Sequence, residues 1–180
     1  MVSRGSPARR HDDTWSLDDA VAWFADPRVA LAVGVLIVND HLLKGAWPGL
    51  VTGKLSDLAG LIIAPLLVLV GARALADCAG RRGLPLRTAA VDAAILTAIA
   101  FAAVKTLSPA ADAYRIFMGV ARWPVDALVA SAAGGGLPPI RPVVLAMDPT
   151  DLIVLPAVLV GAWLATRAPG RRVPRPPDGR

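Results

Sequence analysis

The stretch from Asn39 to Pro65 reads NDHLLKGAWPGLVTGKLSDLAGLIIAP and lies between two long apolar runs. Apolar residues make up 55% of the chain, and the mean hydropathy is +0.55. A soluble domain usually contains about 45–50% apolar residues, even with glycine counted. The composition therefore indicates an integral membrane protein. Because ionisable side chains are costly beside lipid, a dense polar stretch between apolar runs is the first place to look for function.

The overall composition excludes several kinds of site. Cys78 is the only cysteine, so we expect neither an intrachain disulfide nor a cysteine-based metal site. The two histidines, His11 and His41, are too few for a histidine metal cluster, and we expect no metal ion and no cofactor. The net charge is +5, but no basic patch carries interleaved aromatic residues, which argues against a nucleic acid as partner.

Apolar run lengths predict an all-α, polytopic membrane protein with about four transmembrane helices plus an amphipathic or interfacial segment. A bilayer core of about 30 Å needs roughly 20 helical residues to cross it. The four spans are expected at about residues 27–45, 54–76, 88–107 and 150–166. The expected domains are an N-terminal segment with a short amphipathic helix, a four-span membrane domain and a disordered basic tail, at residues 1–26, 27–167 and 168–180.

Two segments outside these spans have amphipathic patterns. The short helix after Ser16 has an apolar, aromatic side, which fits either an interfacial helix on the membrane or a stub packed against the other helices. Residues 108–147 are interpreted as an interfacial or partly re-entrant excursion rather than a full span. Their helix is expected to end at Trp123-Pro124, and its apolar stripe consists of Tyr114, Phe117, Met118 and Ala121.

Arginines set the expected orientation in the membrane. They concentrate in the N-terminal flank, in residues 73–87 and in the C-terminal tail, and four spans place these segments on one side. The positive-inside rule assigns that side to the cytoplasm. We therefore expect a multi-pass protein of the bacterial cytoplasmic (inner) membrane with both termini in the cytoplasm. Residues 44–54 and 106–149 then face the extracytoplasmic side.

The first of three polar motifs ends span one and contains Asn39, Asp40, His41 and Lys44. Asp40 and Lys44 are four residues apart and are expected to pair on one helix face. An ordinary helix end, at which Lys44 reaches toward water and headgroups, explains the same residues.

The second motif, Thr52 to Asp57, opens span two with the letters TGKLSD. It is not a phosphate-binding loop, because position 48 is proline and position 55 is leucine where that loop needs glycine and Ser or Thr. Thr52 or Ser56 can instead cap the helix. Lys54 lies one turn before Asp57 and is expected to neutralise it.

The third motif is Asp148-Pro149-Thr150-Asp151, with a capping aspartate, a proline at the first helical position and an acid in the first turn. Helix initiation alone can explain it. Spans two and four run in the same direction, so Asp57 and Asp151 should reach the same depth. Lys105, at the end of span three, is expected to form a charged cluster at this depth with Asp57 and Asp151 and with Asp40, His41, Lys44, Lys54 and Asp148.

A few further expectations concern roles. Small residues on the face of Asp57, Gly60 and Ala64 predict close approach of a neighbouring helix there. In an enzyme, the acid–base candidates would be Asp57, Asp151 and His41. The residues expected to bind a ligand are Asn39, Asp40, Lys44, Thr52, Lys54, Ser56, Lys105, Asp148 and Thr150.

The motifs NDHxLK, PGxxTGKLSDxAGLxxxPL and DPTDLxxLP resemble those of a family of uncharacterised bacterial integral membrane proteins, over most of residues 35–160. The resemblance implies a membrane topology and no particular activity. A fainter likeness is to the VanZ-like membrane proteins. The chain lacks the histidine that those proteins carry after the position of Asp57, so no residue role is transferred.

Three classes of function fit these observations. The first is an enzyme or binding protein for an envelope lipid or another anionic molecule, in which Asp57 or Asp151 acts as acid or base and Lys54 or Lys105 holds the anion. The second is a small, proton-coupled transporter with a polar path past Asp92, which would need a homo-oligomer. The third is a structural or assembly partner of another membrane protein. In all three the lipid bilayer is a partner.

Overall fold

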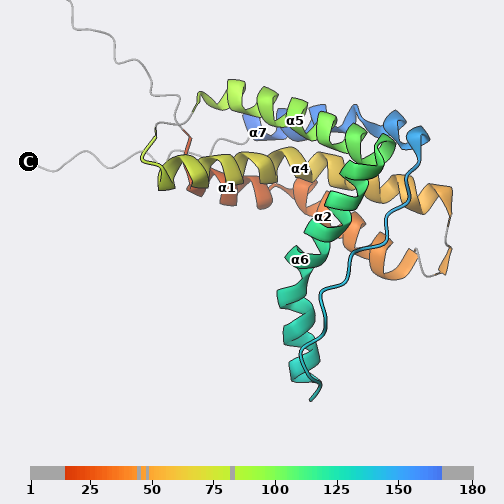
Figure 1. The fold of residues 1–180 in the computed structure, drawn as a ribbon. Helices are drawn as coiled ribbons and strands as arrows, with labels where there is room; N and C mark the ends of the chain where they lie inside the picture. Colours follow the sequence, from red (N-terminus) through yellow and green to blue (C-terminus); the bar gives the residue numbers. More distant parts are fainter. Residues whose placement is uncertain (1–14, 44–45, 48, 82–83, 168–180) are drawn as a thin grey trace, which may run out of the picture.

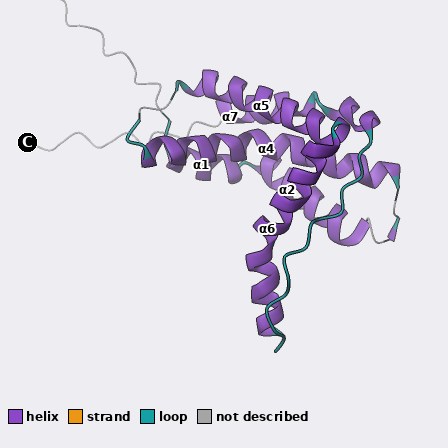
Figure 2. Cartoon of the chain, in the orientation of Figure 1, coloured by secondary structure: helices purple, strands orange, loops and turns teal. Residues whose placement is uncertain are grey.

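The computed structural model describes residues 15–43, 46–47, 49–81 and 84–167, and all regular structure in these ranges is helical (Figures 1 and 2). The predicted disordered tail, residues 168–180, lies outside the described residues. In chain order the elements are α1 (Leu17–Phe24), α2 (Pro27–Val38), the π-helical turn η1 (Asn39–Leu43), α4 (Leu50–Cys78), α5 (Leu86–Thr106), α6 (Ser108–Ala132), the 3-10 helix η2 (Pro149–Val154) and α7 (Ala157–Arg167).

Helices α2, α4, α5 and α7 lie side by side as a bundle in which consecutive members run antiparallel (Figure 1). Three helical segments are long and apolar enough to cross a membrane, namely Val51–Cys78, Leu86–Thr106 and Pro149–Arg167. The apolar helix Pro27–Val38 is shorter. The predicted all-α class is therefore confirmed, and three helices long and apolar enough to cross a membrane lie at the expected places.

The fourth expected span begins differently from an ordinary α-helix. Residues Pro149–Val154 form a 3-10 helix, and the α-helix starts only at Ala157. Hydrogen bonds of the i to i+3 type run through this region, including Leu155 N–H to the Leu152 carbonyl at 3.1 Å. Pro156 has no N–H to donate, so an α-helical ladder cannot run unbroken from Thr150.

Close helix contact occurs at Gly161 in α7, and the prediction that α4 offers the contact face at Gly60 is wrong. A Cβ atom added to Gly161 would lie 3.1 Å from Pro65 Cγ and would collide with the backbone carbonyl of Ile62. A Cβ atom on Gly60 would meet nothing within 4 Å. The small residue that allows close contact is therefore Gly161 in α7, and not Gly60 in α4. Helix α7 packs on α4 around Pro65 rather than on the face of Asp57.

Helix α1 packs Trp23 against the bundle, whereas Val21 and Phe24 of its predicted apolar side are 71% and 36% exposed. Trp23 is completely buried and Trp15 is 6% exposed, with their ring centroids 5.1 Å apart. They belong to an apolar cluster that also contains Val29, Leu66 and Leu164. The indole of Trp23 is thus covered by protein and adds apolar burial to the fold.

Helix α6 and residues 133–148 form an arm that leaves the bundle steeply from the end of α5 (Figure 1). We call residues 108–148 the arm and residues 133–148 its return segment. The prediction that the arm's helix ends at Pro124 is wrong, because α6 continues through it to Ala132. Arg122 and Asp126 form an ion pair across this proline, with 2.9 Å between Nε and Oδ2, which supports the turn that lacks one backbone hydrogen bond.

The return segment runs back along α6 and is fixed to it by three hydrogen bonds. Trp123 Nε1 donates to the Pro138 carbonyl at 2.7 Å, Val143 N–H donates to the Arg115 carbonyl at 3.1 Å, and Arg115 Nη2 donates to the Leu145 carbonyl at 2.9 Å. Between these contacts, a Cβ atom on Gly119 would collide with the backbone of residue 141. The arm is therefore a closely packed hairpin, and not a loose loop.

Candidate functional site

Four ionisable side chains meet at the end of the bundle where α5 leads into the arm. Lys105 Nζ lies 2.7 Å from Asp57 Oδ2 and 2.6 Å from Asp151 Oδ2, and Lys54 Nζ lies 2.9 Å from Asp151 Oδ1. We call Lys54, Asp57, Lys105 and Asp151 the charged cluster. It forms an alternating chain in which each charge has an opposite partner, and it joins α4, α5 and η2. Of the eight ionisable residues predicted to form one cluster, these four converge.

Local sequence explains how each member reaches this place. Lys54 and Asp57 lie near the start of α4, where Thr52 Oγ1 accepts a hydrogen bond from Gly49 N–H at 3.2 Å. This cap starts the helix at Leu50, four residues before the predicted start at about 54. Lys105 is in the last turn of α5, where the negative end of the helix dipole favours a cation.

Asp151 is brought to the cluster by the predicted cap of the fourth span. Asp148 Oδ1 accepts a hydrogen bond from Thr150 N–H at 2.9 Å, as the motif predicted. This backbone hydrogen bond, followed by one from the Thr150 hydroxyl, holds the pKa of Asp148 below its ordinary value. The carboxylate of Asp148 thereby fixes the start of η2, which presents Asp151 toward α4 and α5.

Burial differs along the charged cluster. The side chain of Lys105 is 6% exposed and that of Asp151 is 10% exposed, whereas Asp57 and Lys54 are 20% and 22% exposed. Lys105 Nζ also lies 5.4 Å from the centroid of the Phe101 ring. Lys105 is therefore the buried centre of the cluster, and Lys54 is the member most accessible from outside.

The pairing within the cluster differs from the one expected for the second motif. Lys54 binds Asp151 and the Thr150 hydroxyl, each at 2.9 Å, whereas Asp57 binds Lys105. The expected pair of Lys54 with Asp57 is wrong. Neighbours one turn apart on an exposed helix do pair, but here each finds a partner on another helix. The contacts of α4 with η2 and α5 therefore take the place of the Lys54–Asp57 pair within α4.

A second polar contact connects the end of the first helix to α4. Asn39 is completely buried, and its Nδ2 donates to the Thr52 carbonyl and to Ser56 Oγ, both at 2.7 Å. Its Oδ1 is buried without a hydrogen-bond partner in the structure. The expected binding residues Asn39, Thr52 and Ser56 therefore form a helix-to-helix link, and Asn39 occurs where α2 widens into the π-helical turn η1.

Three of the predicted residues cannot be placed. The predictions for the side chains of Asp40 and His41, and for Lys44, lie outside the described residues, so their pairing and the acid–base role of His41 stay predictions. In the part of the chain that the structure describes, no group of three His, Cys, Asp or Glu side chains could hold a metal ion.

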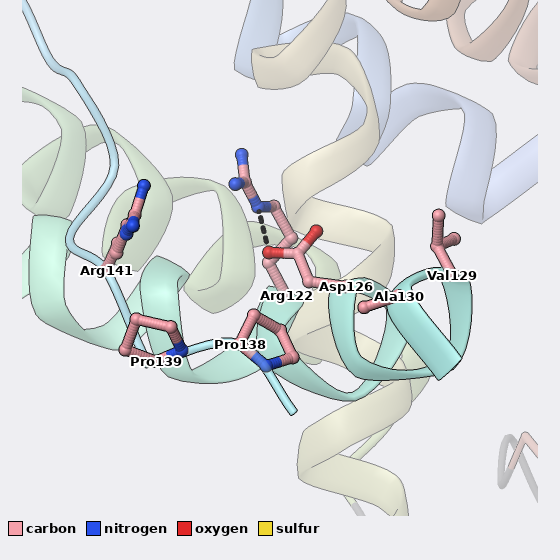
Figure 3. A pocket seen from close by; sticks show the side chains of 7 residues that line it. All are labelled: Arg122, Asp126, Val129, Ala130, Pro138, Pro139 and Arg141. Carbon is pink, nitrogen blue, oxygen red and sulfur yellow. Dashed lines mark hydrogen bonds and ion pairs between the residues drawn. The ribbon is translucent and has the colours of Figure 1, made fainter. Parts of the chain in front are cut away.

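One concave surface was missed by the sequence reasoning. A groove on the arm is lined by Arg122, Asp126, Val129, Ala130, Pro138, Pro139 and Arg141 (Figure 3). It exists because the return segment folds back along α6, and no spacing in the sequence indicates that fold-back. The glycines and prolines at 134–139 predict a turn, but they do not predict what the chain meets after it.

No family model, no curated protein and no solved structure matches the chain. The resemblance to uncharacterised bacterial membrane proteins therefore stays a prediction, and only the geometry of the charged cluster and the arm bears on function.

Proposed function

We propose that the protein is a four-span protein of the bacterial inner membrane with both termini in the cytoplasm. The first crossing would be α2 with η1, which have 12 and 5 residues and run antiparallel to α4. At 1.5 Å per residue they reach about 26 Å, close to a bilayer core of about 30 Å. Arg28, Arg73, Arg87 and Arg167 lie toward the end opposite the charged cluster, and the positive-inside rule favours that end in the cytoplasm.

A reporter enzyme fused after Arg180 tests this topology. Cytoplasmic activity is expected there, and periplasmic activity is expected for an insertion in the glycine run at 134–136. A periplasmic signal from the fusion after Arg180 would overturn the four-span topology.

Within this topology, the function that the geometry supports best is that of a structural or assembly protein that holds the arm at the outer surface of the membrane. The observation that carries this proposal is the Lys105–Asp151 ion pair of 2.6 Å. Lys105 lies just before the arm and Asp151 lies just after it, so their ion pair joins the two ends of the arm. When Lys54 and Asp57 are included, every charge in the charged cluster has an opposite partner. This suits a lock, by which we mean a contact that fixes the positions of the helices, better than a reactive site.

The free-energy cost of breaking the charged cluster agrees with its role as a lock. Removing one partner of a buried ion pair costs about 3–5 kcal/mol, because the remaining charge is left unpaired. In the charged cluster, loss of Lys105 would leave two carboxylates facing each other. The three elements that carry these groups would lose the contact that sets their relative positions, and the arm would lose its fixed direction.

Spin labels measure that direction. One label is placed at Ser131 near the tip of the arm and one at Leu75 in α4, with Cys78 replaced by serine. We expect a narrow distance distribution in the parent protein and a broad one in Lys105→Met. An Arg73→Gln variant is the control, because its ion pair with Asp77 lies at the other end of α4. An unchanged distribution in Lys105→Met would sink the proposed role of the cluster.

A second candidate function is the binding or conversion of an anionic envelope lipid at the cluster itself. It is favoured by Lys54, which is 22% exposed and lies beside the exposed hydroxyl of Thr150. An incoming phosphate could take over the ammonium of Lys54 while Lys105 continues to neutralise Asp151. Lys54→Gln should then remove function in a complementation assay at only a small loss of stability, because Lys54 is the most exposed member and Asp151 keeps Lys105. A lock predicts that function stays near normal.

Transport is less well supported. Directly beneath the charged cluster lies a buried apolar layer of Leu61, Ala94, Ala157 and Val158. Asp92, on the far side of this layer, is exposed on α5. A polar path from the cluster to Asp92 would have to pass outside one copy of the bundle, for example between copies in a homo-oligomer.

A further inference from the structure

The arm carries a groove of about 400 Å³ between α6 and the return segment, separate from the charged cluster. Its floor contains Pro138 and Pro139, and its rim contains Arg122 and Arg141 (Figure 3). Both arginine side chains rise on the same side of the two prolines in that view. We call this surface the arginine groove.

The arginine groove holds more positive than negative charge. Arg122 uses its Nε to bind Asp126 at 2.9 Å, which leaves its terminal nitrogens as donors. The side chain of Arg141 makes no hydrogen bond or ion pair with any described residue, and it is exposed. Two guanidinium groups against one carboxylate suit an anion, and the planar donor fork of arginine fits phosphate oxygens especially well.

The opposite face of α6 is apolar and uncovered. Val120, Phe117 and Leu128 are 50%, 64% and 72% exposed, and at 100° per residue they lie across the helix from Arg122 and Asp126. A helix with an apolar face on one side and arginines on the other lies in the headgroup layer of a membrane, with its apolar face toward the acyl chains. The arginines of such a helix reach the lipid phosphates.

We propose that the arginine groove binds the phosphate of an anionic membrane lipid. Arg122 and Arg141 donate to the phosphate oxygens. Charge complementarity, together with the exposed apolar face that favours α6 in the headgroup layer, selects a lipid as occupant. The inference rests on the proposed position of the arm at the membrane surface.

Hydrogen exchange of the full chain in nanodiscs tests this site. The two compositions are pure phosphatidylcholine, and phosphatidylcholine with one third phosphatidylglycerol. We expect phosphatidylglycerol to slow exchange in residues 134–145 about tenfold, which corresponds to about 1.4 kcal/mol. The slowing should be lost in Arg122→Gln/Arg141→Gln. The matched control, Arg81→Gln/Arg87→Gln, removes two exposed arginines outside the arm and should retain it.

The same hydrogen-exchange measurement distinguishes an anionic lipid from other occupants of the arginine groove. Protection that persists in Arg122→Gln/Arg141→Gln overturns the proposal, and so does equal protection by inorganic phosphate or by an acidic peptide in pure phosphatidylcholine. Exchange in α4 reports whether each variant is folded. A well-fixed arm without lipid-dependent protection contradicts this inference alone, whereas an arm that stays fixed in Lys105→Met contradicts the proposed function.

Discussion

Lys105 and Asp151 are separated by 46 residues of chain but by 2.6 Å between Nζ and Oδ2. The whole arm lies between them in sequence. Because Lys105 also binds Asp57, one ammonium group ties the two ends of the arm to the first turns of α4. We propose that the relative placement of arm and bundle depends on this contact.

Replacement of Lys105 by methionine is expected to destabilise the protein by about 3–5 kcal/mol, since two carboxylates lose their shared cation. The measurement is thermal unfolding in detergent. The triple variant Lys105→Met/Asp57→Asn/Asp151→Asn should recover much of the loss, because no unpaired carboxylate remains and Lys54, which loses Asp151, is 22% exposed. Arg73→Gln, which removes a more exposed ion pair, should cost at most about 1 kcal/mol. Equal losses in the single and triple variants would show that packing, and not charge, is responsible.

The contact at Gly161 predicts opposite effects for two glycine-to-alanine changes. Gly161→Ala should cost about 1–3 kcal/mol, because the added methyl group collides with the Ile62 carbonyl and crowds Pro65. Gly60→Ala should be neutral or stabilising by up to about 1 kcal/mol, since its site is open and alanine favours a helix interior. Thermal unfolding of both variants side by side decides the matter. Destabilisation by Gly60→Ala would place the close helix contact on the other face of α4.

Gly119→Ala is expected to separate the return segment from α6, because the new methyl group would overlap the backbone at residue 141. Limited proteolysis should then cut residues 133–147 many times faster while the bundle stays intact. Gly71→Ala, at an open position in α4, is the control. A return segment that stays protected in Gly119→Ala would mean that the hydrogen bonds of Arg115 and Trp123 hold it without the close contact.

The lowered pKa of Asp148 predicts a pH dependence with a defined sign. A carboxylate whose pKa is lower in the folded than in the unfolded state stabilises the fold above the unfolded value of about 3.9, and this contribution disappears as the pH falls through the folded value. The stability difference between parent and Asp148→Asn should therefore shrink between pH 5 and 3. Asp148→Ala, which lacks the acceptor, should be less stable than Asp148→Asn at every pH. A parent-to-variant difference that grows on acidification would contradict the assignment.

The sequence predicted the elements that depend on local chemistry. Apolar runs gave the helices of spanning length, and Asp148-Pro149 gave the helix start. The depth argument brought Asp57, Asp151 and Lys105 together, because antiparallel helices of similar length place their ends in register. Run length, capping residues and the depth of helix ends all follow from the order of residues along the chain, so a single sequence is enough to predict them.

Contacts that depend on how helices rotate against each other were not predictable in the same way. Lys54 could pair with Asp57 or with Asp151, and spacing alone favours the neighbour. Gly60 and Gly161 look alike as small residues, but only the packed structure shows which one meets a carbonyl oxygen. The fold-back of the return segment is set by Gly119 and Trp123, which are ordinary helix residues in the sequence.

The burial of Trp23 has a consequence for how the protein is made. Its cluster draws side chains from Val29 in α2, Leu66 in α4, Ala90 in α5 and Leu164 in α7. Leu164 follows the other three in the sequence, so the apolar site for the Trp23 indole is incomplete until α7 has been translated and inserted. Helix α1 is synthesised before α7, and we therefore expect Trp23 to reach its packed position only after α7 is in place.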